Sequence, residues 1–206
     1  MEQVQVILPD GSERTYPAGT TPADVAKDVS SRLAREALVA KVNGRLVDLA
    51  TPLEGRVELQ IMTADDPEGL DTLRHSTAHL MAQAIQRLYP GTKLAIGPTI
   101  ENGFYYDIDC PQQLSSDDFA VIEEEMRKIV KENLPIRREE IPKAEAEKMF
   151  RELGDVFKLE ILEDLEDGSI SLYRQGEFVD LCRGPHVPST GRLKAFKLLS
   201  VAGAYW

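Results

Sequence analysis

Cysteine is scarce in this sequence, with only Cys110 and Cys182 among 206 residues. Two cysteines are too few for a disulfide-stapled scaffold, so each is interpreted as a site residue or a buried thiol. Apolar runs near the ~20 residues of a membrane helix are also missing. The N-terminus, MEQVQVILPDG, lacks the basic start and the apolar core of a signal peptide. We therefore expect a cytoplasmic protein with no membrane partner.

Basic residues are the minority among the charged side chains. Lys and Arg number 24 against 35 Asp and Glu, which gives a net charge of −11. This excludes the broad basic surface typical of proteins that bind long nucleic acids, so any RNA contact must be local. No acidic residue follows Asp180, whereas four basic residues do: Arg183, Arg192, Lys194 and Lys197. This basic tail is the candidate place for such a contact.

The composition that is present is that of a folded protein, with 42% hydrophobic and 29% charged residues. At this length the chain holds one large or two small domains. A polar run with proline and glycine, ADDPEG at 64–69, is typical of a linker. The sequence therefore predicts two domains, residues 1–64 and residues 65–206.

The first domain has the pattern of a small mixed sheet over one helix. Turn signals at Asp10-Gly11 and Asn43-Gly44 predict two hairpins, and RVELQIM predicts a closing strand. Thr21 before Pro22 predicts a helix start, and the helix has one apolar face that consists of Val25, Val29 and Leu33. The order predicts a ubiquitin-like β-grasp domain.

The second domain alternates helices and strands irregularly, which predicts an α+β fold, larger and mixed. Helical periodicity marks RHSTAHLMAQAIQRLYP, residues 116–133 and KAEAEKMFREL, while IRREEI predicts a strand. Hairpins are expected at Asn102-Gly103, with Tyr105 and Tyr106 on a strand, and at Gln175-Gly176. VFKLEILEDL fits a helix or a strand equally.

All three histidines fall into two short patterns. His75 and His79 stand four residues apart on a predicted helix, so their imidazoles share one face. Cys182 and His186 flank a Gly-Pro turn that lets thiol and imidazole converge. Together the four could form a tetrahedral zinc set or a metal-free cluster of acid, base and hydrogen-bonding groups.

Three further residues are candidates for the same site. Asp180 lies two residues before Cys182 on a predicted strand and so shares its face. Lys158 stands among apolar residues that either desolvate its amine or let it reach the surface. Of Tyr105 and Tyr106, at most one can reach a site from a strand.

These motifs resemble the N-terminal region of bacterial-type threonyl-tRNA synthetases. The resemblance is carried by HSTAHLMAQAIQRLYP, IGPTIENGFYYDID, SLYRQGEFVDLCRGPHVPSTG and FKLLSVAGAYW, and it covers essentially the whole chain. The first domain resembles the TGS module. The second resembles the editing domain shared with alanyl-tRNA synthetase.

The resemblance implies an ester hydrolase that removes serine from seryl-tRNA(Thr) and spares threonyl-tRNA(Thr). A missing methyl is worth only about 1 to 3 kcal/mol of discrimination, so a second sieve is needed. It also implies that the aminoacylation core and the anticodon-binding domain would follow Trp206. The chain would then stop inside an apolar strand, AGAYW. The fragment would then make no aminoacyl-tRNA. Its partners would be the acceptor end of serine-charged tRNA(Thr) and the rest of the synthetase, with the fragment itself a monomer.

Residue roles also follow from the resemblance. His75 would act at the ribose end, and Lys158 would activate water or stabilise the oxyanion. His79, Cys182 and His186 would shape the pocket. The substrate-binding residues would be Asp180 for the ammonium of serine, Tyr106 for the ribose or terminal adenosine, and Arg183 of the basic tail for the tRNA end.

The resemblance favours hydrolysis without a required cofactor, although zinc at His75, His79, Cys182 and His186 stays possible. Three rival functions remain. One is a zinc-binding module without catalysis, and another is an RNA-binding or partner-binding module led by the TGS domain. The third is a free-standing trans-editing enzyme.

Overall fold

The computed structural model describes residues 2–204 of the chain. By packing, the described chain divides into two compact units: residues up to Leu73 with Gly184–Pro188, and residues from Arg74 to Arg183 with those from Ser189 onward. The domain boundary after residue 64 stays a prediction. Among the described residues, no helix combines the length and apolar character needed to cross a bilayer.

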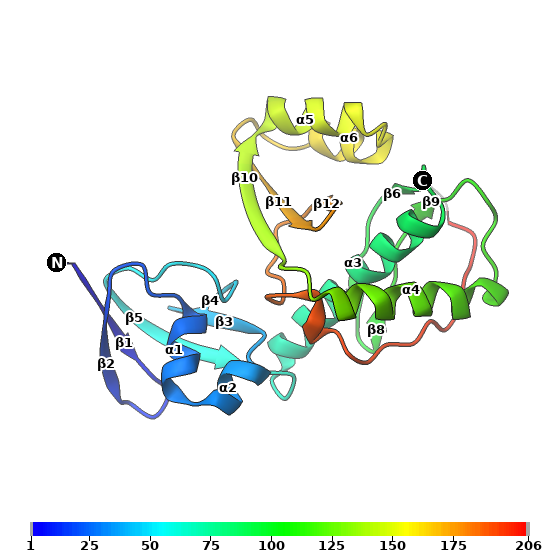
Figure 1. The fold of residues 1–206 in the computed structure, drawn as a ribbon. Helices are drawn as coiled ribbons and strands as arrows, with labels where there is room; N and C mark the ends of the chain where they lie inside the picture. Colours follow the sequence, from blue (N-terminus) through cyan, green and yellow to red (C-terminus); the bar gives the residue numbers. More distant parts are fainter. Residues whose placement is uncertain (1, 205–206) are drawn as a thin grey trace. The chain divides into compact units, whose positions relative to one another are not determined.

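The first unit is built on a five-stranded sheet in the order β2-β1-β5-β3-β4 (Figure 1). The central β1 and β5 run parallel, and every other neighbouring pair is antiparallel. The strands are β1 (Gln3–Ile7), β2 (Glu13–Pro17), β3 (Val39–Val42), β4 (Arg45–Val47) and β5 (Arg56–Met62). This arrangement agrees with the predicted β-grasp pattern.

Helix α1 (Pro22–Val29) begins where the sequence predicts it. Thr21 and Asp24 cap each other's backbone N–H groups, and Pro22 fills the first turn, where no donor is needed. The prediction of one continuous apolar face through Leu33 is wrong. Ser30 takes an extended conformation that ends α1 and caps a second helix, α2 (Ser31–Glu36), so Val29 is left 37% exposed.

The second unit begins within helix α3 (Pro67–Leu88) and contains a three-stranded antiparallel sheet and two small ribbons. The sheet consists of β10 (Arg137–Pro142), β11 (Ser169–Gln175) and β12 (Phe178–Leu181). The ribbons pair β6 (Lys93–Leu94) with β9 (Ile108–Asp109) and β7 (Thr99–Ile100) with β8 (Gly103–Phe104). The other helices are η1 (Ser116–Asp118), α4 (Phe119–Glu132), α5 (Lys143–Glu152), α6 (Val156–Glu163) and η2 (Thr190–Arg192).

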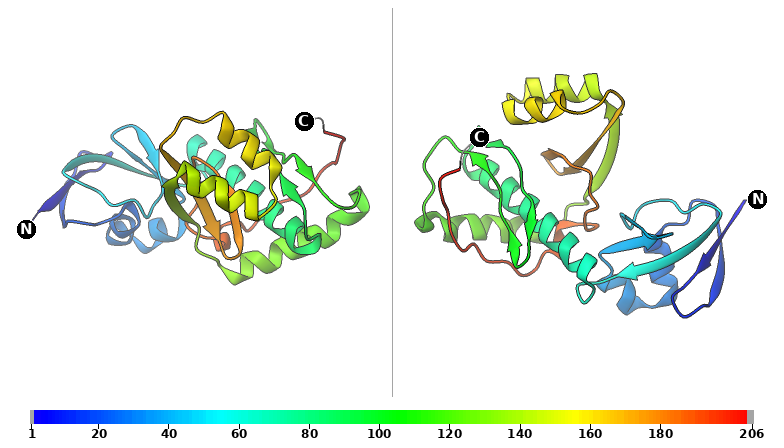
Figure 2. Two further views of the ribbon diagram at one scale, coloured as in Figure 1. Left: turned by 90° about the horizontal axis from the view of Figure 1, so that it is seen from above. Right: turned by 180° about the vertical axis from the view of Figure 1, so that it is seen from behind.

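Helices α5 and α6 lie side by side over one face of the β10-β11-β12 sheet, as the views in Figure 2 show. Their contact is a small apolar core that includes Phe150, Leu162 and Leu172, each at most 1% exposed. The segment VFKLEILEDL, whose sequence fits a helix or a strand equally, forms a helix, α6. A helix brings Lys158 and Leu162 to one buried side. The predicted α+β class is confirmed.

Glutamine side chains fix α3 against the end of β11. Gln83 Nε2 donates to the Gln175 carbonyl at 3.1 Å, and Gln175 Nε2 donates to Gln83 Oε1 at 2.8 Å. Both side chains are 1% exposed, so these hydrogen bonds are shielded from water. His79 lies one helical turn before Gln83, and β12 follows Gln175. The contact between the two glutamines therefore sets the distance between the site residues on α3 and those on β12.

Three local predictions are wrong. Residues 67–69 of the predicted linker form the first turn of α3, since proline is favoured at a helix start. Tyr105 and Tyr106 lie between β8 and β9 rather than on a strand, although one faces outward and the other inward as predicted. Val201–Ala204 form no strand, and Tyr205 and Trp206 lie outside the described residues.

Replacing Gly69 by alanine is expected to destabilise the protein. Propensity alone predicts a gain of about 1 kcal/mol for alanine in a helix. A Cβ at Gly69, however, would lie 1.9 Å from the carbonyl oxygen of Thr63, which is backbone and cannot swing away. We expect urea unfolding to show a loss of about 1 to 3 kcal/mol, as overpacked sites do. A stabilised variant would contradict this reading.

Candidate active site

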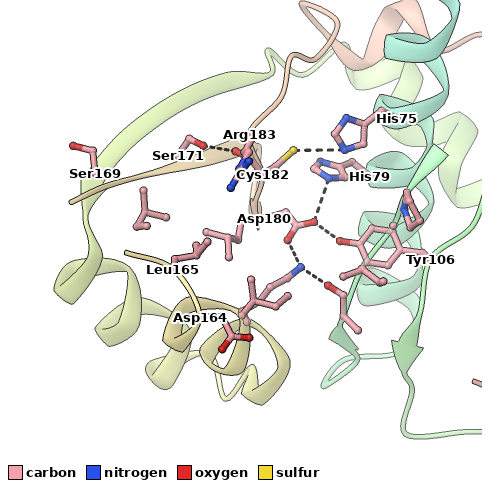
Figure 3. A pocket seen from close by; sticks show the side chains of 18 of the residues that line it. His75, His79, Tyr106, Asp164, Leu165, Ser169, Ser171, Asp180, Cys182 and Arg183 are labelled. Atoms are coloured by element: carbon pink, nitrogen blue, oxygen red, sulfur yellow. Dashed lines mark hydrogen bonds and ion pairs between the residues drawn. The ribbon is translucent and has the colours of Figure 1, made fainter. Parts of the chain in front are cut away.

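The second unit contains a cavity of about 870 Å³ between α3, the β6–β9 region, α6 and β11–β12 (Figure 3). Among its polar lining are seven of the eight residues predicted to form the site: His75, His79, Tyr106, Lys158, Asp180, Cys182 and Arg183. The apolar part of the lining includes Ile96, Ile161 and Ile170. A concave, largely apolar space with a few convergent polar groups is the usual form of a small-molecule site.

His75 and His79 project from one face of α3, as their spacing predicts. Their ring centroids are 5.1 Å apart in an edge-to-face arrangement, and His75 Nε2 lies 3.5 Å from Cys182 Sγ. Burial raises the pKa of the Cys182 thiol, but hydrogen bonds from His75 and His79 outweigh it and lower that pKa to about 6. The thiol therefore sits in the site as a thiolate near neutral pH.

Asp180 is the centre of the polar network. Its side chain is buried, and Oδ1 lies 2.7 Å from Lys158 Nζ while Oδ2 lies 3.2 Å from His79 Nε2. The Tyr106 hydroxyl donates a hydrogen bond to Oδ2 (Figure 3). Burial would raise the pKa of the carboxyl, but the positive charge of Lys158 and the bond from His79 hold it well below its usual range. Asp180 is thus a fixed anion.

His79 is held as a cation by the same carboxylate. Burial disfavours the charged imidazole, yet hydrogen bonds to Asp180 and Cys182 raise its pKa to about 9. Its ring also packs edge-on against Phe178, with centroids 5.5 Å apart. A buried, charged, doubly held imidazole is suited to orienting its neighbours rather than to moving a proton near neutral pH.

Lys158 is buried, with 3% of its surface exposed. Besides Asp180, its ammonium donates to the carbonyl oxygen of Ala95 at 2.7 Å. Of the two alternatives open from the sequence, the desolvated one therefore holds. The amine lies in the cavity wall and does not reach the protein surface.

The Tyr106 ring packs against the backbone of Gly97, where only glycine fits. A Cβ at Gly97 would lie 2.3 Å from the Tyr106 ring. Burial and the negative charge of Asp180 raise the pKa of the Tyr106 phenol well above its ordinary value, so the hydroxyl stays a proton donor. Its partner Tyr105 is 44% exposed and points away.

The remaining predicted residues differ in setting. Arg183 is exposed at the cavity wall. His186 is buried, its backbone N–H donates to Asp48 Oδ1 at 2.8 Å, and its role in the site stays a prediction. Cys110, predicted to be a buried or loop thiol, follows β9 and accepts a 3.6 Å hydrogen bond from Thr92.

The donor set of this site is compatible with a metal ion. Ligand atoms of His75, His79 and Cys182 lie within 4.8 Å of one another, and imidazole with thiolate is the donor chemistry that zinc prefers. The bond from Asp180 to His79 is also the kind of outer contact that metal-bound histidines make. The residues present therefore fit zinc chemically.

Two contributors to the site carry no signal in the sequence. The Ala95 carbonyl that holds Lys158 is backbone, and Gly97 is required by its contact with the Tyr106 ring, which only the fold creates. Asp155, which caps α6, did carry a signal, since aspartate ahead of a helical segment is typical of an N-cap.

Comparison with known families finds a match for two segments of the chain. Residues 4–63 match the TGS domain, and residues 170–204 match the second additional domain of threonyl and alanyl tRNA synthetases. The second match spans β11, β12 and the basic tail, and so includes Asp180 and Cys182 of the site. The chain therefore contains one segment that matches a TGS domain and another that matches the second additional domain of these synthetases.

The similarity to particular proteins is high and continuous. The chain is 58% identical to the threonine–tRNA ligase of Geobacillus kaustophilus over 204 residues, which is 98% of this chain and 31% of the relative. It is 57% identical to that of Rubrobacter xylanophilus over 201 residues, again 98% and 31%. The chain thus spans about a third of the length of the relatives it matches. Its predicted resemblance to the N-terminal region of bacterial threonine–tRNA ligases is confirmed.

Proposed function

We propose that this chain hydrolyses the ester bond of seryl-tRNA(Thr) and spares threonyl-tRNA(Thr). The observation that carries the proposal is the buried Lys158 ammonium, held at 2.7 Å by Asp180 in the wall of a cavity shared with His75 and Cys182. Ester hydrolysis needs an oriented water, a stabilised oxyanion and a protonated leaving oxygen, and this wall offers groups for each.

Lys158 is the proposed group for the water or the oxyanion. An ammonium has three N–H donors. Among residues 2–204, two donors are accounted for by Ala95 and Asp180. The third is available to an oxygen in the cavity, and a fixed cation in a low-dielectric wall stabilises developing negative charge strongly.

His75 is the proposed group for the leaving ribose oxygen. It lines the cavity, is partly exposed, and contacts Cys182 through Nε2 at 3.5 Å. Histidine is the side chain that most often transfers a proton in general acid–base catalysis. His79 is not assigned this role, because its Nε2 is already paired with Asp180 Oδ2 at 3.2 Å.

Asp180 and Tyr106 are proposed to receive the amino acid and the ribose. Both oxygens of Asp180 already have protein partners, so the ammonium of serine would share the carboxylate with Lys158, His79 and Tyr106. That crowding favours a small amino acid. A wall fixed by so many bonds has little freedom to admit the extra methyl of threonine, which is how a second sieve rejects the larger substrate.

The tRNA end is proposed to enter beside Arg183. This residue is exposed at the cavity wall and begins the basic tail, in which no acidic side chain dilutes the positive charge. Phosphates are bound by such local basic groups even on an acidic protein. The relatives' name supports a tRNA partner for the longer proteins.

Zinc is kept as an alternative, with His75, His79, Cys182 and His186 as its predicted ligands. A bound zinc would supply a water of lowered pKa. The chain's own residues would still act as described: Asp180 orients His79 through the 3.2 Å bond, and Arg183 binds the tRNA end.

The test is deacylation of seryl-tRNA(Thr) beside threonyl-tRNA(Thr), with and without chelator. We expect selective loss of the seryl ester, insensitivity to chelator, and a decrease of about 100-fold or more in His75→Ala, the usual scale for general acid–base groups. Arg127→Ala, on the exposed side of α4, is the control and should keep full activity.

Other outcomes separate the alternatives. Activity that chelator removes would assign the His and Cys residues to zinc. If tRNA binds without being deacylated, the rest of the synthetase should be added in trans. Continued inactivity would then overturn the proposal in favour of a binding module.

A further inference from the structure

Every fourth residue along one row of α3 contacts the β11–β12 hairpin. The row consists of His75, His79, Gln83 and Arg87, which stand on one slanted ridge of the helix. The two histidines belong to the proposed site, and Gln83 bonds the backbone of Gln175. Arg87, in the last turn of the helix, has no part in the proposed chemistry.

The hairpin meets this row in steps of nearly the same length. Cys182 Sγ lies 3.5 Å from His75 Nε2. Two residues earlier, Asp180 Oδ2 lies 3.2 Å from His79 Nε2 (Figure 3). Four residues of a helix rise about 6 Å, and two residues of a strand rise about 6.6 Å. The two rows therefore stay in step, but equal steps do not by themselves choose which histidine faces Cys182.

Glu177, at the tip of the hairpin, has contacts that do choose the register. Its two carboxylate oxygens accept from Nε and Nη2 of Arg87, the second bond at 3.1 Å. Oε2 also accepts from Gln83 Nε2 at 3.2 Å. A guanidinium that bonds both oxygens of one carboxylate fixes orientation as well as distance. The bond from Arg87 is the main cause that lowers the pKa of Glu177 to about 2, so the pair stays charged near neutral pH.

The same guanidinium also contacts α4. Its Nη1 donates to Glu132 Oε2 at 2.8 Å, and Glu125 Oε1 lies 3.6 Å from the same nitrogen. Arg87 therefore has carboxylate partners on two elements. Of these two, the hairpin contributes Asp180 and Cys182 to the cavity wall, whereas the residues that line the cavity include none from α4.

We propose that Arg87 is a positioning residue, which acts through Glu177 to set the register of the β11–β12 hairpin along α3. This register places Asp180 against His79. The Glu177 side chain is 55% exposed, and exposed ion pairs contribute little to the free energy of unfolding, so we expect an effect on alignment more than on stability. The effect on hydrolysis rests on the proposed function, whereas the effect on alignment does not.

The first readout follows the imidazoles by NMR at fixed pH and needs no activity. The chain has three histidines, so their ring signals are readily assigned when histidine alone is labelled with ¹⁵N. Glu177→Gln removes the charge on the hairpin, and Arg87→Met removes the guanidinium. Both variants should shift the Nε2 signal of His79, because its contact with Asp180 changes when the hairpin moves along α3.

Glu132→Gln is the matched control. It also removes a charged partner of the Arg87 guanidinium, but on α4 instead of the hairpin. The His79 signal of this variant should match that of the wild type. Equal shifts in the Glu132 and Glu177 variants would overturn the proposal. An unchanged His79 signal in folded Glu177→Gln would overturn it as well, whether or not Arg87→Met folds.

Deacylation is the second readout. Glu177→Gln should lower kcat for the seryl ester by about 10- to 100-fold, the scale of a displacement of about 1 Å at a site. KM should change little, since neither Glu177 nor Arg87 lines the cavity. Arg87→Lys keeps the charge without the planar fork and should retain only part of kcat, whereas Glu132→Gln should retain all of it. If the wild type does not deacylate seryl-tRNA at all, the proposed function fails, but the His79 signal still decides the role of Arg87.

Discussion

Replacing Lys158 by methionine is expected to abolish ester hydrolysis and to destabilise the fold. The variant keeps the length of the side chain but removes the cation that lies 2.7 Å from Asp180 Oδ1. Loss of a preorganised electrostatic group lowers kcat by about 100- to 1000-fold. Removing one partner of a buried ion pair costs about 3 to 5 kcal/mol, because the other charge stays buried.

Two measurements check this expectation: single-turnover deacylation of seryl-tRNA(Thr) and the free energy of unfolding in urea. The double variant Lys158→Met with Asp180→Asn removes the buried charge as well as its partner. We expect it to unfold with a smaller loss than the sum of the two single variants, while it stays inactive. Additive stability losses would show that the two side chains do not interact as described.

Gly97→Ala is expected to have the second largest effect. The new Cβ would lie 2.3 Å from the Tyr106 ring, a distance at which the phenol must leave its place on Asp180. Overpacking of this kind costs about 1 to 3 kcal/mol. Displacing a group by about 1 Å at a site lowers the rate by about 100-fold. We therefore expect the rate of deacylation to fall by about the same factor.

Gly103→Ala is the matched control for this variant. It lies in the neighbouring hairpin, and a Cβ there would meet nothing within 4 Å. The second check is Gly97→Ala combined with Tyr106→Ala, which removes the colliding ring and should be more stable than Gly97→Ala alone. A Gly97→Ala protein with wild-type activity and stability would falsify the proposed packing of Tyr106.

Much of the fold could be predicted because local chemistry decides it. The Thr21-Pro22 start and the Asn43-Gly44 turn gave α1 and the β3–β4 hairpin near their observed places. The errors lie where two local signals compete. Ser30 can end one helix and cap the next, and the polar run at 67–69 suits a linker as well as a first helical turn.

The candidate site was predictable as a list of residue types. Scarcity made the histidines informative, and the spacing of His75 and His79 fixed one shared face. The two-residue spacing of Asp180 and Cys182 likewise predicted that both side chains lie on one side of their strand. Both line the cavity. For Lys158, the sequence left burial and exposure equally open.

The sequence by itself determined the β-grasp and α+β classes, the family resemblance and the chemistry-bearing side chains, because these depend on short-range spacing and residue type. Only the tertiary structure decided that Asp180 holds Lys158, His79 and Tyr106 together, and that the Ala95 carbonyl and Gly97 complete the wall. The physical reason is that hydrogen-bond partners and desolvation are set by residues tens of positions apart. These residues come close together only once the β11–β12 hairpin, α6 and α3 have packed.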